Sequence, residues 1–127
     1  MQIESYQDLI AWQRTISFVK MVYVAAAQFP REETFGLKSQ MRRAAVSLPS
    51  NIAEGQGRAS RGDFYQFLGQ ARGSLYELET QIILACELGY FSTEQQQRLI
   101  RESRELGRIR NGLMTSLKSP SSRMQPA

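Results

Sequence analysis

Seven apolar residues between positions 64 and 85 follow one another at alternating steps of four and three. They are Phe64, Leu68, Ala71, Leu75, Leu78, Ile82 and Ala85. A strand would present its apolar residues at steps of two, so this spacing predicts a helix with a coiled-coil-like seam. We expect Ser60 to cap its first turn, and Leu88 with Gly89 to end it.

The same helix carries a second stripe, turned about 80° from the seam at the rotation of 100° per residue of an α-helix. Its members are Tyr65, Arg72, Tyr76, Glu79 and Ile83. Two stripes on one helix predict two packing partners.

Three further windows show helical periodicity. The first covers residues 8–28 and stops at Phe29-Pro30. The second follows Thr34, a candidate N-cap, and runs through Pro49 without a phase break as far as Gly55. The last covers residues 92–117. We therefore predict an all-α fold, an antiparallel up-down-up-down four-helix bundle over residues 1–117, with the second helix kinked at Pro49 and a disordered tail over residues 118–127.

The second half of the first window is apolar on nearly every side, because Phe18, Met21, Val22 and Val24 add to its stripe. A deeply sandwiched helix in a monomer would look like this, and so would a helix that packs against a second subunit. We favour the second subunit, and expect an oligomer.

The 127-residue chain has no histidine and one cysteine, Cys86. It therefore lacks the usual general base, the usual zinc ligand and any intrachain disulfide. Ser47, Ser50 and Ser74 have no histidine to activate them. We expect no catalytic residue, no metal site and no cofactor. The N-terminus does not resemble a signal peptide, and the longest apolar run, residues 21–27, is too short for a membrane span. These features predict a cytoplasmic protein that does not enter a membrane.

The net charge is +4, and thirteen of the sixteen basic residues are arginine, which suits phosphate or carboxylate recognition. Arg101, Arg104 and Arg108 fall within about 60° on a helical wheel, opposite the leucines. Arg98 flanks them. Such a stripe fits nucleic-acid phosphates, and the alternative is a solvated face balanced by Glu105. A second basic group brackets the kinked region: Arg42, Arg43, Arg58 and Arg61.

Several charged or polar residues fall near apolar positions, where they must be paired. Glu102 lies among the leucines of the last window, and Glu54 has a natural partner in Arg72. Asn51 lies three residues before Glu54. We interpret these side chains as a structural network that fixes helix register. The alternative is a catalytic carboxylate.

Two stretches, Arg43-Ala-Ala-Val-Ser-Leu-Pro-Ser-Asn-Ile-Ala-Glu-Gly55 and Phe64-Tyr-Gln-Phe-Leu-Gly-Gln-Ala-Arg-Gly-Ser-Leu-Tyr-Glu-Leu-Glu79, resemble the signatures of a four-helix-bundle family. This family is associated with intervening sequences of bacterial 23S ribosomal RNA genes. Tyr6-Gln-Asp-Leu-Ile-Ala-Trp12 resembles its usual start. The family includes proteins similar to the accessory variability protein of diversity-generating retroelements.

The resemblance covers about residues 5–117 and implies a homopentameric barrel of bundles with a basic surface. It also implies nucleic-acid binding, beside a reverse transcriptase in the retroelement members. The positions that match the signatures, with a role that looks structural, are Asn51, Glu54, Gly55, Arg72, Ser74 and Glu77.

The leading hypothesis is a non-enzymatic, oligomeric protein that binds structured RNA or DNA with low sequence specificity. A second hypothesis is a protein–protein adaptor that docks a partner through its helix faces. A third is a carboxylate-dependent hydrolase.

Overall fold

The computed structural model describes residues 5–58 and 60–118. Its long helices are α1 (Ile10–Ala26), α2 (Leu37–Gly57), α3 (Arg61–Glu87) and α4 (Thr93–Lys118). Two short 3₁₀ helices, η1 (Tyr6–Asp8) and η2 (Arg31–Glu33), precede α1 and α2. The described residues contain no strand, so the predicted all-α class is confirmed. Lys118 is the last residue of α4 rather than the first of a tail, and residues 119–127 lie outside the described ranges.

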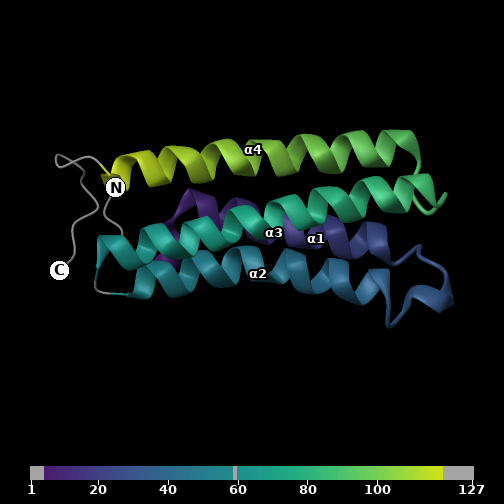
Figure 1. Cartoon of the computed structure of the whole chain (residues 1–127), viewed down its shortest axis with the longest axis horizontal. Coiled ribbons are helices and arrows are strands. Elements are labelled where there is room, and N and C mark those ends of the chain that lie inside the picture. Colours follow the sequence, from purple (N-terminus) through teal and green to yellow (C-terminus); the bar gives the residue numbers. More distant parts are fainter. Residues whose placement is uncertain (1–4, 59, 119–127) are drawn as a thin grey trace.

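Each long helix packs against the next one along the chain, and α4 closes the bundle by packing against α1. Figure 1 shows the helices side by side along the long axis, with the chain reversing its direction at each connection. The predicted four-helix bundle is therefore confirmed. This order places α4 between α3 and α1, so that both of its neighbours contribute contacts to its charged residues.

The predicted seam of α3 forms the centre of the core, and all seven of its residues are buried. Around it, apolar residues gather in two clusters. The larger includes Phe18, Met41, Leu78 and Leu106, which come from four different helices. The smaller lies around the start of α3 and includes Leu9, Ile52, Phe64, Leu68 and Leu117.

The second stripe of α3 has no complete cover within one chain. Tyr76 remains 58% exposed and Ile83 42% exposed. On α1, Phe18 and Val22 are fully buried whereas Val24 is 68% exposed. The bundle therefore buries only part of the apolar surface of α1 and α3. Packing of the remainder against a second subunit stays a prediction.

The start of α2 differs from the prediction. Thr34 is exposed and does not cap the helix, which begins at Leu37 with Gly36 in the N-cap position. A carboxylate oxygen of Glu33 accepts the hydrogen bond of the Leu37 backbone amide at 2.9 Å, and the hydroxyl of Tyr90 donates to the other oxygen. Glu33 thus provides the cap that Thr34 was expected to provide.

Helix α2 continues through Pro49, as the unbroken period predicted; the kink itself stays a prediction. Proline has no amide hydrogen and leaves a gap in the helical hydrogen bonds. Side chains next to it bond to nearby backbone carbonyls: Ser47 donates to Ala44, Ser50 to Val46 and Asn51 to Ser47. The predicted cap of α3 is confirmed, since the Ser60 hydroxyl accepts from the Asp63 amide at 2.9 Å.

Candidate nucleic-acid interface

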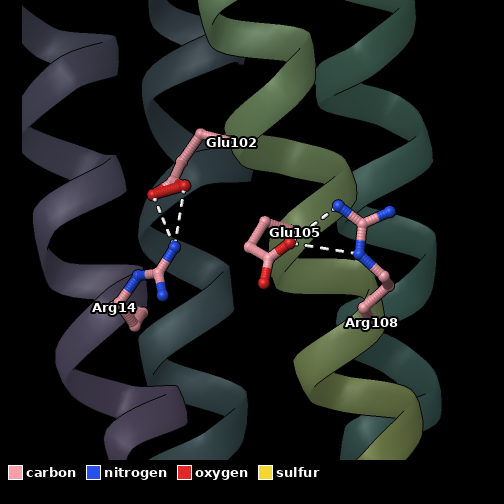
Figure 2. Close-up of polar contacts among 4 residues, drawn as sticks. All are labelled: Arg14, Glu102, Glu105 and Arg108. Carbon is pink, nitrogen blue, oxygen red and sulfur yellow. Dashed lines mark hydrogen bonds and ion pairs between the residues drawn. The ribbon is translucent and has the colours of Figure 1, made fainter.

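An ion pair shows which side of α4 faces α1. Arg14 on α1 donates to both carboxylate oxygens of Glu102 at 2.9 and 3.1 Å. Glu102 retains 22% side-chain exposure. The prediction that Glu102 must be paired is therefore confirmed, and its partner comes from another helix. Figure 2 shows Glu102 and Arg108 on opposite sides of the α4 ribbon.

The three arginines predicted to point away from the core do so. Arg101, Arg104 and Arg108 are exposed and line one hollow of about 440 Å³. The other residues that line it are Gln96, Gln97 and Ile100. We call these three arginines the arginine edge. From Arg101 to Arg108 there are seven steps along the helix, so the edge extends about 10 Å at 1.5 Å per residue.

Two members of the arginine edge have acidic neighbours. Arg108 lies 2.7 Å from Glu105 within α4, and Arg104 lies 3.7 Å from Glu79 on α3. Among the described residues no ion pair involves Arg101. Exposed pairs of this kind contribute only about 0–1 kcal/mol each. A phosphate oxygen can therefore replace either carboxylate at small cost, and Arg101 needs no such exchange.

Arg98 is exposed but separate from the arginine edge. It lines a hollow of about 230 Å³ at the junction of α1 and α4, beside Met21, Val24 and Gln28. Steps of three residues place Arg98 and Arg101 near one side of a helix in sequence, but the two side chains line different hollows.

The second basic group does not form one patch. The guanidinium of Arg42 stacks over the ring of Tyr23 at 4.6 Å, and Arg43 donates to Ser39. Arg58 and Arg61 lie about four turns further on, at the junction of α2 and α3.

These latter two arginines make contacts within the chain. Arg58 pairs with Glu54 and stacks over the ring of Phe67, and Arg61 donates to the backbone carbonyl of Leu117 at 2.7 Å. Three members of the group, Arg42, Arg58 and Arg61, are thus engaged in holding helices, and Arg43 is exposed.

The predicted pair of Glu54 with Arg72 is wrong. Glu54 is 57% exposed and bonds to Arg58, four residues later on its own helix. Arg72 is also exposed and bonds to the hydroxyl of Tyr76. The physical reason is that Gly55 allows the Phe67 ring to pack directly on α2, so Glu54 remains on the outer side.

The expected structural network is therefore a set of separate contacts. One of them joins α2 to α3: the hydroxyls of Ser47 and Ser74 are hydrogen-bonded to each other at 2.6 Å. The others are local, as when Asn51 donates to the carbonyl of Ser47 and Gln81 donates to Glu77. Register between α2 and α3 thus depends on close packing and one serine pair rather than on buried charge.

Residue Arg110 has a setting that the sequence did not predict. It is 8% exposed, and its hydrogen-bond acceptors include the Leu68 carbonyl and the Asn111 side chain. Burial lowers the pKa of Arg110, and the nearby charge of Arg72 lowers it further. The available signal was its place on the leucine side of α4, where a charged residue is unusual.

Within the described ranges, no three or more acidic or cysteine side chains gather in a way that could hold a metal ion. Nor is any helix of this part of the chain long and apolar enough to cross a membrane.

The fold and these surfaces define an all-α bundle protein with an exposed arginine edge on its last helix. The chain belongs to the family described as 23S rRNA-intervening sequence protein, whose model matches residues 7–112. The resemblance seen in the sequence is thereby confirmed.

A solved structure supports the fold. The chain is similar to a protein of unknown function from the S23 ribosomal protein family of Bacteroides thetaiotaomicron, with a TM-score of 0.75 and 21% identity. The match covers 84% of this chain and 96% of that one. No functionally curated protein matches the chain. Neither the family nor this structure is described in terms of diversity-generating retroelements, so that part of the resemblance stays a prediction.

Proposed function

We propose that this protein binds the phosphate backbone of structured RNA or DNA through the arginine edge of α4. The observation that supports the proposal is the arrangement of Arg101, Arg104 and Arg108, exposed in one hollow with only weak acidic competition. The family description, which refers to 23S ribosomal RNA, is consistent with an RNA ligand.

Binding of this kind is electrostatic and reads little sequence. Guanidinium groups donate to phosphate oxygens, which every nucleotide carries, so contacts to the backbone position a ligand without specifying bases. Gln96 and Gln97 line the same hollow and offer amides for further hydrogen bonds. Neither the guanidinium groups nor these amides act as a general base or a nucleophile at neutral pH. We therefore propose a binding protein rather than an enzyme.

We further propose that several copies assemble, so that the arginine edge is repeated around a ring. Val24, Ile83 and Leu84 are 68%, 42% and 45% exposed, and an assembly would remove such apolar side chains from water. The family resemblance suggests a homopentamer. Light scattering at micromolar concentration should give a mass well above one subunit, and a monomer mass would reject the assembly.

The direct test of nucleic-acid binding is a titration of the full chain with single-stranded RNA, structured RNA and duplex DNA of unrelated sequences, at several salt concentrations. We expect affinity to fall steeply with salt and to vary little with sequence. A lack of salt-dependent binding to every ligand would contradict the proposal.

The second candidate function is an adaptor that docks another protein. The observation that favours it is the same exposed apolar set on α1 and α3. In that case binding to the partner would persist at high salt, because burial of apolar surface is not screened by ions. Salt dependence therefore separates the two functions.

A further inference from the structure

A second hollow of about 440 Å³ opens between α3 and α4, toward the end of α4 that carries Lys118. Three of its lining side chains are cationic: Arg72, Arg110 and Lys118. Two tyrosines, Tyr65 and Tyr76, also line it. No acidic residue is among the described residues that form its wall, so the hollow concentrates positive charge without compensation.

Arg110 is the most deeply buried of these three cationic side chains. It is 8% exposed, and its named hydrogen-bond acceptors, a backbone carbonyl, an amide oxygen and a thioether, are all neutral. Its Nε atom is buried and makes no hydrogen bond. Buried cations are rare unless an anion pairs with them, because removing the charge from water costs several kcal/mol. An anion in the hollow would supply the compensation that the chain itself does not.

Arg72 is placed to share that anion. Its guanidinium lies over the ring of Tyr76, 5.2 Å from the centroid, and donates to the Tyr76 hydroxyl at 3.3 Å. These contacts hold the side chain beside the hollow without neutralising it. Lys118, which is exposed, adds a third positive charge.

We infer that this hollow, formed around Arg110, Arg72 and Lys118, binds the phosphate group of a nucleotide. A phosphate monoester carries a charge of about −1.5 to −2 at pH 7, which matches three cations better than a single carboxylate does. Planar guanidinium groups suit phosphate oxygens. A hollow of about 440 Å³ falls within the range of small-molecule sites, and the tyrosine rings offer a surface for the base or sugar.

The site shares no residue with the arginine edge, so the two proposals can fail separately. The test is calorimetric titration of the full-length protein, in a low-salt buffer without phosphate, with inorganic phosphate and with adenosine monophosphate. We expect saturable binding of both, tighter for the nucleotide. Arg72→Gln should weaken binding roughly tenfold or more, because a charge-assisted hydrogen bond is lost. Arg110→Met should abolish it.

Arg31→Gln is the matched control, because it removes an exposed arginine of η2 that lines neither the hollow nor the arginine edge, and it should leave nucleotide binding unchanged. If Arg110→Met does not fold, Arg72→Gln and Lys118→Gln, both at exposed positions, still decide the question. Wild type that binds neither probe, or variants that bind as well as wild type, would overturn the inference. So would an Arg72→Gln variant that changes only the oligomeric mass, since the anion would then be a carboxylate of a second copy.

A final arm identifies the source of the phosphate. If a short RNA displaces adenosine monophosphate, the hollow takes a phosphate of a nucleic-acid strand. If RNA does not displace it, the hollow takes a free nucleotide. Either result supports a phosphate site.

Discussion

The Nη2 atom of Arg14, on α1, lies 2.9 and 3.1 Å from the two carboxylate oxygens of Glu102, on α4 (Figure 2). This pair joins the first and last helices of the bundle, which are 88 residues apart in sequence at this point. Because Glu102 faces α1, the neighbouring Arg101 and Arg104 point outward, where they are exposed. The pair therefore helps to set the orientation of the arginine edge.

Replacing Glu102 with glutamine should lower the free energy of unfolding by about 1 kcal/mol, because a charge-assisted contact between partly buried side chains is lost. Urea unfolding measures the change. Glu105→Gln is the control, since its pair with Arg108 lies within one helix and should contribute less than about 0.5 kcal/mol. A larger effect at Glu105 than at Glu102 would contradict the role given to the interhelical pair.

Leu75→Ala should destabilise the protein by about 2–5 kcal/mol, since it deletes a buried leucine from the α3 seam. Gln70→Ala, on the same helix but exposed, should change stability by no more than about 0.5 kcal/mol. Thermal melts of the two variants test the seam directly. An unchanged melting temperature for Leu75→Ala would mean that the core is wrongly assigned.

Gly55→Ala should cost about 1–3 kcal/mol through overpacking. A Cβ atom at this position would lie 2.7 Å from the Cβ of Phe67 and 2.9 Å from a ring carbon of Phe64. Gly57→Ala is the matched control, since nothing lies within 4 Å of a Cβ there. Equal stabilities of the two variants, measured by chemical denaturation, would show that α2 and α3 are further apart at Gly55 than these distances require.

Glu54→Ala should change the free energy of unfolding by less than about 1 kcal/mol, because its pair with Arg58 is exposed. A buried pair with Arg72 would instead have cost about 3–5 kcal/mol. Denaturation of this variant beside Arg58→Ala separates the two cases. A loss of several kcal/mol for Glu54→Ala alone would contradict the exposed pair and support a buried partner for Glu54.

The sequence predicted the helices well where one periodic pattern decided the outcome. The α3 seam has a strict spacing, so its register followed from the positions of seven residues, all of which are buried. The cap at Ser60 followed from a local signal that needs only a neighbouring amide. Both features follow from a sequence pattern that lies within one helix or its first turn.

The site was less predictable, because its contacts depend on how helices approach one another. The position of Glu54 is set by the close packing at Gly55, which no spacing rule encodes. Thr34 gave a cap signal, but Glu33 reaches the first amide of α2 instead. Arg110 lies on the leucine side of its helix, and only the packing of α3 against α4 shows that it is buried.

The most direct test of the central proposal replaces Arg101, Arg104 and Arg108 together with glutamine and measures RNA binding at several salt concentrations. All three are exposed, so the fold should be unaffected. Each lost phosphate contact should reduce the slope of log affinity against log salt by about 0.7 to 0.9.

The control is Arg43→Gln, an exposed arginine on α2, which should bind RNA as wild type does. Weaker binding and a smaller salt slope for the triple variant, with an unchanged melting temperature, is the result we predict. Binding by the triple variant with the affinity and salt slope of wild type would contradict the proposal that the arginine edge holds the nucleic acid.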